Sequence, residues 1–388
     1  MASRRGTRTY LVASRFISRK LKFQGNLAAV AIAVSFFVII VAVAVSSGFR
    51  HTIREAVADM TGDLRVAPFP DTEELPAMSL EQGLADSLLA LRDVRSVTPV
   101  AFRAGIVKSK DLVHGVMVKG IPGGADGTGQ PLAVSIPRRL SEITGLHEGD
   151  DLTVYFVGEK VRVRKFHITR VHRDLLEVDE NLLVYACLED IQRLNGWDDG
   201  QVSCLDVRVR DGSRAKLQEL SFAIGALLED YYVTTSAQTY PQLFDWLDLL
   251  DFNVLVVLIL MTAVAAFNMV SGLLVMLLRN IPTIGTLKTL GMGNGAIGGL
   301  FVRIGAQAVL KGMLAGNAAG LLFCLVQGTT HLIPLDPANY FVAWVPVHVS
   351  VPALLAADAV AFALILGLLW LPTLVIATID PATTVKAD

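Results

Sequence analysis

The chain has 388 residues, of which 53% are hydrophobic, and its mean hydropathy of +0.52 is above that expected of a water-soluble protein of this length. Its formal net charge is −2, and it has no basic patch interleaved with aromatic residues, which argues against a nucleic-acid partner. Together these features favour a membrane protein.

The first apolar segment, 27–47, follows a basic stretch, 1–26, that contains no acidic residue. The basic residues of that stretch are Arg4, Arg5, Arg8, Arg15, Arg19, Lys20 and Lys22. A cleaved signal peptide has the same order of parts, but this apolar run is too long for one and Val45-Ser46-Ser47 is a poor cleavage site. Because a bilayer core requires about 20 apolar helical residues, 27–47 is predicted to be the first transmembrane helix.

A hydrophilic insert, 48–251, separates this helix from the next apolar segment. Helical periodicity near its two ends and alternating residues such as Val161, Val163 and Lys165 predict an α+β domain with an inserted β-rich subdomain at about 122–196. The insert has no histidine pair with zinc spacing, no calcium-binding loop and no nucleophile motif. We therefore expect neither a metal nor a catalytic residue.

Two of the three cysteines, Cys187 and Cys204, belong to predicted strands of this insert. If the insert lies outside the cytoplasm, they could form a disulfide. The interpretation that we favour is two buried thiols, and the sequence leaves both open.

Three more apolar segments follow, at 252–278, 296–328 and 351–377, and each is long enough to cross a bilayer. The loop 279–295 carries Arg279 and Lys288 and no acid, whereas the loop 329–350 carries Asp336 and no Lys or Arg. The positive-inside rule then places the N-terminus, the loop 279–295 and the tail 378–388 in the cytoplasm, and the insert 48–251 outside it.

The cytoplasmic loop has the pattern of a short amphipathic helix. Pro282 suits a first helical turn, Ile284, Leu287 and Leu290 recur at helical spacing, and Gly291 is placed to end the helix. Such a helix can dock into a groove of a partner protein, although a plain connection between two membrane helices would have a similar pattern.

The third span contains both small and charged residues. Gly312, Gly316 and Gly320 form a small-xxx-small face, which we interpret as a packing seam within the subunit rather than a dimer face. Arg303 and Lys311 are intramembrane charges and therefore functional candidates. Arg303 could extend to the cytoplasmic interface, whereas Lys311 could face a cavity, a lipid headgroup or a carbonyl of a neighbouring helix.

The sequence does not predict a nucleotide-binding site. The G-x-G-x-x-G match at 293–298 lies between two membrane helices, where no strand precedes it, and is attributed to chance. No G-x-x-x-x-G-K-[ST] motif occurs, so we expect no enzyme activity and no cofactor in this chain. ATP with magnesium would have to be bound by a partner ATPase.

At this point the order of segments resembles a known family, the FtsX/MacB-type ABC transporter permeases, and within it the LolC/LolE-type lipoprotein-releasing permeases. The stretches that carry the resemblance, in chain order, are GFRHTIREAV, GLHEGDDLTVYF, VRVRKFHITRV, YPQLFDWLDLLDFN, AFNMVSGLLVMLLRNIPTIGTLKTLGM, KGMLAGNAAG, LDPANYFVAWVPV and IDPATTVKAD. Pro282 departs from the family, which usually has a polar or acidic residue there, so the detail of the cytoplasmic contact is open.

The resemblance implies an α-helical inner-membrane protein with four transmembrane helices and a periplasmic domain that has porter and sabre subdomains. It implies a second permease subunit, a cytoplasmic ATPase, a lipoprotein substrate and a periplasmic carrier. The loop 279–295 would be the coupling helix on the ATPase, with Arg279, Thr283, Ile284, Leu287, Lys288 and Leu290 as contact residues.

A cavity between the first two spans would receive acyl chains. Candidate lining residues are Ile40, Val43, Phe49, Phe252, Leu255, Val256 and Ile259, although packing against lipid would have the same sequence. The alternatives to lipoprotein extraction are a MacB/FtsX-like permease that transmits ATP-driven motion to a periplasmic partner, and a membrane scaffold without transport activity.

Overall fold

The computed structural model describes residues 22–69, 77–80, 83–109, 112–124, 127–158, 161–172, 182–374 and 376. The described chain divides into two compact units. We call Thr52–Trp246 together with Leu335–Ala343 the inserted domain, and the other described residues the membrane bundle. Residues 1–21 of the predicted N-terminal segment and the whole predicted tail, 378–388, lie outside the described residues.

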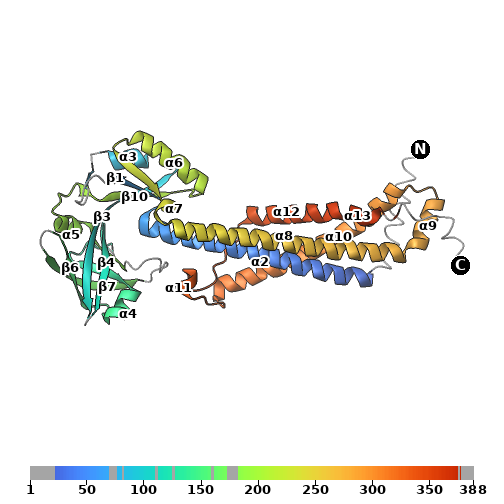
Figure 1. Cartoon of the computed structure of the whole chain (residues 1–388), viewed down its shortest axis with the longest axis horizontal. Coiled ribbons are helices and arrows are strands. Elements are labelled where there is room, and N and C mark those ends of the chain that lie inside the picture. The colour runs from blue at the N-terminus through green and yellow to red at the C-terminus, as the bar shows by residue number, and fades with distance from the viewer. Residues whose placement is uncertain are drawn as a thin grey trace. The chain divides into compact units, whose positions relative to one another are not determined.

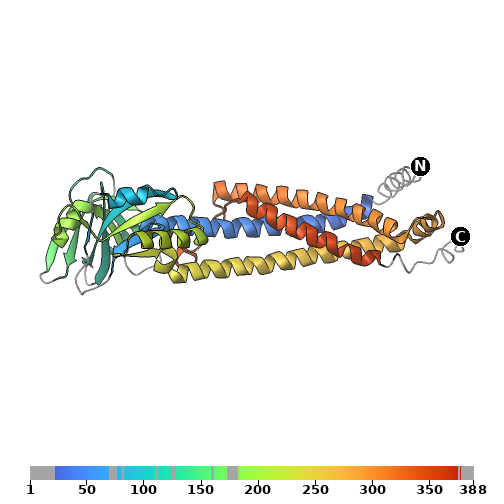
Figure 2. The same cartoon turned by 90° about the horizontal axis from the view of Figure 1, so that it is seen from above.

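Four described helices are long and apolar enough to cross a membrane, and each overlaps one predicted span, the last of them only as far as Thr373. Figures 1 and 2 show them side by side in the bundle. They are α2 (Lys22–Thr61), α8 (Pro241–Arg279), α10 (Asn294–Thr330) and α12 (Val351–Leu368), the last continued by α13 (Trp370–Thr373). At 40 and 39 residues, α2 and α8 are about twice the length that a bilayer core requires, so both continue beyond their predicted spans.

Local chemistry explains several helix boundaries in the bundle. α12 ends at Leu368 because Pro372 has no N–H to donate to the Leu368 carbonyl and its ring would crowd that turn. The connection between α8 and α10 forms the short helix α9 (Ile281–Thr289), with Pro282 in its first turn. Gly291 then adopts a φ of 85°, a left-handed conformation that favours glycine and ends the helix.

The core of the bundle is formed by large apolar side chains from all four long helices. Phe36 of α2, Met269 of α8, Phe301 of α10 and Ile365 of α12 are all buried in one cluster. Burial of such side chains against one another is what fixes the helices within this unit.

The inserted domain is built on a nine-stranded sheet in the order β11-β1-β10-β3-β4-β8-β5-β7-β6, with a separate β2–β9 pair. The strands are β1 (Leu64–Pro68), β2 (Met78–Ser79), β3 (Val94–Ser109), β4 (Leu112–Ile121), β5 (Ala133–Pro137), β6 (Asp151–Phe156), β7 (Arg162–His172), β8 (Leu182–Cys187), β9 (Gln201–Val202), β10 (Cys204–Val209) and β11 (Tyr231–Thr235). The helices are α3 (Leu84–Leu89), α4 (Arg138–Thr144), α5 (Leu188–Asn195), α6 (Arg214–Leu227), α7 (Ser236–Thr239) and α11 (Pro337–Tyr340).

The long strand β3 belongs to two parts of this sheet. Its first half pairs with β10, for example at Val100 and Cys204, and its second half pairs with β4. Additional pairing between β3 and β6, at Ile106–Tyr155 and Val107–Val154, closes β3, β4, β8, β5, β7 and β6 into a ring. The predicted subdomain 122–196 supplies β5 to β8, and the preceding hairpin of β3 and β4 completes the ring (Figure 1).

The hydrophobic core of this domain is continuous through both parts of the sheet. Leu64 and Val207 are fully buried in the four-stranded part, and Phe156 and Phe166 pack edge to face in the ring, with ring centroids 6.3 Å apart. The segment Leu335–Ala343 joins the domain through Phe341, whose ring lies 5.7 Å from that of Trp246.

The cysteines of the domain are free thiols. Cys187 ends β8 and Cys204 begins β10, and both are buried. The structure therefore contains the two buried thiols and not the Cys187–Cys204 disulfide that the sequence left open.

Candidate functional site

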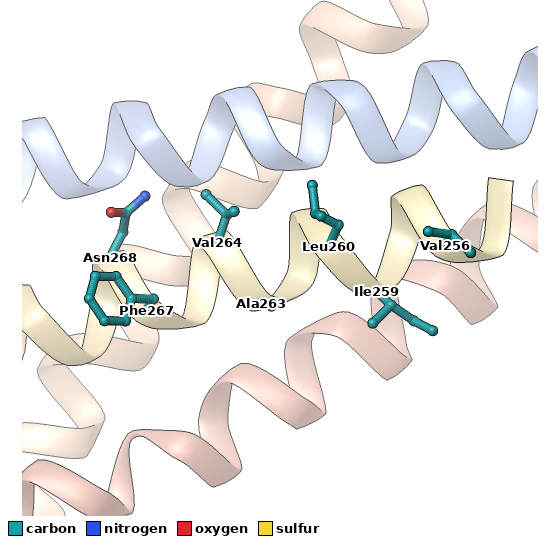
Figure 3. Close-up of a pocket in the computed structure, with 7 residues that line it drawn as sticks. All are labelled: Val256, Ile259, Leu260, Ala263, Val264, Phe267 and Asn268. Carbon is teal, nitrogen blue, oxygen red and sulfur yellow. The ribbon is translucent and has the colours of Figure 1, made fainter. Parts of the chain in front are cut away.

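The hollow of interest in the membrane bundle lies along one face of α8 and has a volume of about 560 Å³. Its lining residues are Val256, Ile259, Leu260, Ala263, Val264, Phe267 and Asn268. In Figure 3, Leu260, Val264 and Asn268 project toward the ribbon of α2, whereas Ile259 points away from it. Because all but one of these side chains are apolar, the hollow suits a hydrocarbon ligand.

The structure divides the predicted acyl-chain residues into two groups. Phe252, Leu255, Val256 and Ile259 are all exposed on α8, and Val256 and Ile259 line the hollow. On α2, Ile40 and Phe49 are buried and Val43 is half-buried. Ile40 is used for packing, since it lies against Gly320 of α10. Of the predicted lining residues, those that are exposed therefore all belong to α8.

The three glycines of the third span lie on the face of α10 that contacts α2. A Cβ atom added to Gly316 would lie 2.4 Å from the Ala33 carbonyl oxygen, and one added to Gly312 would lie 2.8 Å from that of Ala29. Gly320 approaches Ile40 in the same way. This seam lets the two backbones approach within one subunit, as small residues do between membrane helices.

The predicted coupling residues on and around α9 face in two directions. Ile284 is fully buried and Leu287 packs against the bundle core, while Lys288 donates a hydrogen bond of 2.7 Å to the Ile376 carbonyl. Arg279, Thr283 and Leu290 are exposed, with Leu290 at 77%. The second group forms the free surface of this segment, and the first holds it in place.

Charged groups connect α2 and α8 at one end of the bundle. Arg50 of α2 forms ion pairs with Asp248 and Asp251 of α8, and Ser46 donates a hydrogen bond to Asp251. The sequence reasoning did not include these residues, although an arginine and two aspartates bordering apolar spans were a usable signal. The contacts hold the C-terminal half of α2 beside the N-terminal half of α8.

A buried lysine fixes the end of α2 inside the inserted domain. Lys119 of β4 is 3% exposed and donates hydrogen bonds to the Met60 carbonyl at 2.6 Å and to Asp206 at 2.7 Å. Asp206 also accepts a hydrogen bond from Arg65 at 3.0 Å. Burial lowers the pKa of Arg65, but the Asp206 carboxylate, together with Cys204 and Tyr240, raises it above its ordinary value. Nothing in the local sequence marks Lys119 as buried.

Asp63, just after the end of α2, is hydrogen-bonded to the first residue of α7. Asp63 accepts a hydrogen bond from the Ser236 backbone N–H through its carbonyl and from the Val209 N–H through its carboxylate, both at 2.9 Å. Thr235 starts α7 with a capping box in which Gln238 is the partner. α7 is followed by α8, so the connections to both long helices are anchored to neighbouring strands, β1 and β11.

The membrane helices contain both buried and exposed polar residues. Asp358 of α12 is buried and accepts a hydrogen bond from Asn317 of α10, a pair that the sequence reasoning missed although Asp358 is the only acidic residue in the last span. Arg303 and Lys311 of α10 are instead exposed. Among the described residues, no group of three His, Cys, Asp or Glu side chains is arranged to hold a metal ion.

The chain matches the family described as FtsX-like permease C-terminal over residues 255–381. Lipoprotein-releasing system transmembrane protein LolE of Haemophilus influenzae is 22% identical over 361 residues, which is 82% of this chain and 83% of that protein. The corresponding LolC of Xylella fastidiosa strain Temecula1 is 23% identical over 385 residues, 92% of each chain.

Solved structures also align with part of the chain. The periplasmic region of MacB from Actinobacillus actinomycetemcomitans aligns with 48% of this chain and 95% of its own, at 17% identity and a TM-score of 0.32.

Proposed function

We propose that the chain, whose residues 255–381 match the FtsX-like permease family, is an ABC transporter permease subunit that extracts lipoproteins from the inner membrane and passes them to a periplasmic carrier. The observation that carries the proposal is the apolar hollow on α8. The proteins named LolE and LolC, which align with 82% and 92% of the chain, support the choice of lipoproteins as the substrate class.

The chemistry of the substrate agrees with that of the hollow. A lipoprotein anchor consists of acyl chains, which need a smooth apolar surface and few hydrogen-bonding groups. Each buried CH₂ group contributes about 0.8 kcal/mol to anchoring in a bilayer, so extraction requires an energy source. The sequence has no phosphate-binding loop, and the energy would come from ATP and magnesium bound by a separate cytoplasmic ATPase.

The segment that would receive this energy is α9 with its flanking residues. Its exposed residues Arg279, Thr283 and Leu290 are the proposed ATPase contacts, because Ile284, Leu287 and Lys288 are used within the bundle. Leu290→Asp should abolish co-purification of the ATPase and leave the thermal stability of the permease unchanged. The matched control is Leu332→Asp, which changes a leucine that is also well exposed and lies beyond the other end of α10. Retention of the ATPase by Leu290→Asp would contradict the coupling role.

The proposed orientation places the N-terminus, α9 and the C-terminus in the cytoplasm and the inserted domain in the periplasm. Its support is the distribution of basic residues, which are abundant in 1–26 and present in 279–295 but absent from 329–350. A second permease subunit, either another copy or a related chain, would face the exposed surface of α8 and complete the cavity.

Lipoprotein sorting tests the proposal directly. Depletion of the protein should leave lipoproteins in the inner membrane, and wild-type protein should restore their release. Ile259→Asn places a polar amide in the hollow and should impair lipoprotein release. The control is Leu364→Asn, which changes a similarly exposed leucine of α12 that does not line the hollow and should leave release unchanged. Unchanged sorting on depletion would exclude lipoprotein extraction.

One observation favours a second function, transmission of ATP-driven motion to a periplasmic partner without lipid transport. The end of α2 is fixed to the inserted domain by Lys119, and Asp63 joins it to the start of α7, so movement of the long helices would reach the domain. Altered drug efflux or septation on depletion, with normal lipoprotein sorting, would support this function instead.

A further inference from the structure

Two cations and an amide form a polar stripe on the exposed face of α10. Arg303, Gln307 and Lys311 are spaced four residues apart, so they follow one another along one side of the helix, and all three are exposed. Within the described part of the chain, none of their side chains has a hydrogen bond or an ion pair. Two unpaired cations in an apolar span require a partner from outside this chain.

Packing against α2 fixes the depth of this stripe. Gly312, the residue after Lys311, lies against Ala29 of α2, and the apolar run of α2 starts only at Leu27. From Gly312 to Thr330, where α10 ends, there is no charged residue, and this length is already close to the ~20 residues that cross a hydrocarbon core. Lys311 therefore lies at the edge of the core, and Arg303 lies ~12 Å further along the axis toward the start of α10.

The direction of α10 lets the side chains of Arg303 and Lys311 reach the same headgroup layer of the membrane. Side chains of an α-helix lean toward its N-terminus, which for α10 is the cytoplasmic end in the orientation proposed above. Lys311 can thus extend its ammonium group out of the hydrocarbon while its methylene groups stay within it. Leu314, exposed about one turn beyond Lys311, offers apolar surface on the membrane side of the charges, and Leu310 is exposed beside them.

The charges of the chain argue against a second copy as the partner. The sequence has no Asp or Glu from residue 1 to 54 or from 252 to 335, and Asp358 is buried against Asn317. Among the described residues, a second copy would therefore bring no free carboxylate to this level of the membrane, and its only other acidic residues on this side, Asp380 and Asp388, belong to the tail outside them. The anionic groups that occur in that layer of a bacterial membrane are lipid phosphates.

We infer that Arg303, Gln307 and Lys311 bind the phosphate headgroup of an anionic phospholipid of the cytoplasmic leaflet. The acyl chains of that lipid lie along Leu310 and Leu314. The inference uses the orientation given under the proposed function but not the lipoprotein substrate. Its test measures lipid retention by the isolated permease, so the two can fail separately.

The test uses the full-length chain purified in a nonionic detergent and incubated with equal amounts of phosphatidylglycerol and phosphatidylcholine. Native mass spectrometry then gives the ratio of the two lipids that remain bound. The wild-type protein should be enriched in phosphatidylglycerol, and Arg303→Gln/Lys311→Gln should lose this enrichment, by roughly fivefold for each charge removed. Excess inorganic phosphate should not displace the lipid, because it cannot use the apolar surface.

The matched control is Arg95→Gln/Lys108→Gln, which removes two exposed cations from β3 of the inserted domain and should keep the enrichment. Equal enrichment in the wild-type protein and in Arg303→Gln/Lys311→Gln would overturn the inference. So would displacement by phosphate alone, or loss of subunit association with unchanged lipid binding, which would identify a protein contact.

Discussion

The inserted domain and the membrane bundle differ in which side chains they bury and which they expose. In the inserted domain, charged side chains such as Lys119 and Asp206 are buried and paired with each other. In the bundle, large apolar side chains such as Ile259 and Phe267 are exposed, and the cations Arg303 and Lys311 have no partner in the described chain. These buried charges of the domain are thus paired within the chain, whereas the bundle has surfaces that lipid, substrate or other subunits must cover.

The largest expected effect concerns the buried ion pair of the domain. Lys119→Met leaves Asp206 with Arg65 as its partner and leaves the Met60 carbonyl without its donor. Breaking a buried pair costs about 3–5 kcal/mol, so thermal unfolding of the full chain, followed by the fluorescence of its tryptophans, should begin at a clearly lower temperature. Lys108→Met, on the exposed surface of β3, should change stability by less than about 0.5 kcal/mol. Equal stability of the two variants would show that the pair does not anchor α2.

The second prediction concerns the thiols of the same domain. Burial, and secondarily the nearby Asp206, raises the pKa of Cys204 to about 12, and burial together with Glu189 raises that of Cys187 to about 11. Only ~0.01% of Cys204 and ~0.1% of Cys187 is then thiolate at pH 8, about a thousandfold and a hundredfold less than for an ordinary thiol of pKa 9. Because the pKa is raised, alkylation in native conditions should be slow at pH 8 and accelerate with rising pH.

Detection of the reaction by mass spectrometry after tryptic digestion reports each thiol separately. Urea-unfolded protein serves as the control and should label rapidly at both positions. Rapid labelling of Cys204 in the native chain would show that this part of the domain opens easily.

The third prediction concerns the seam between α10 and α2. Gly316→Ala puts a methyl group where the Ala33 carbonyl and Phe36 already lie, so the helices must separate, at a cost of about 1–3 kcal/mol. Gly328→Ala is the matched control, because a Cβ there meets nothing within 4 Å and alanine favours the helix. The measurement is thermal unfolding in detergent. A melting temperature as high for Gly316→Ala as for Gly328→Ala would mean that the two helices do not pack as described.

The smallest effect is expected for the exposed ion pairs that join α2 and α8. Arg50→Gln removes the pairs with Asp248 and Asp251, and because these groups are well exposed, the change in stability should be below about 1 kcal/mol. The melting temperature should accordingly shift by a few degrees at most, and by less in high salt, where exposed pairs are already screened. A loss comparable to that of Lys119→Met would show that the bundle also depends on charge pairing.

The parts of the molecule that the sequence could predict are those set by local patterns. The four apolar lengths located the membrane helices, and the pattern from Pro282 to Gly291 located α9. The sequence could not separate Ile40, which packs on Gly320, from Ile259, which lines the hollow, since both are isoleucines in apolar helices. Whether such an isoleucine packs or is exposed depends on whether another helix lies against its face of the helix.

Long-range contacts account for the other omissions. The burial of Lys119 depends on Asp206, which is far away in the chain, and the closure of the ring depends on β3 meeting β6. Asp358 is similar, because its partner Asn317 belongs to another helix. None of these pairs leaves a local periodic signal.

The sharing of β3 between the two parts of the sheet limits how this protein can be recombined with its relatives. A chimera that exchanged only 122–196 would join foreign β6 to the native edge of β3, at Ile106 and Val107, and would break a register of matched side chains. A graft that also carries the hairpin of β3 and β4 keeps that edge with its own partner. The smallest segment that can be exchanged as a unit therefore begins inside β3, upstream of residue 122, where the composition of the chain changes.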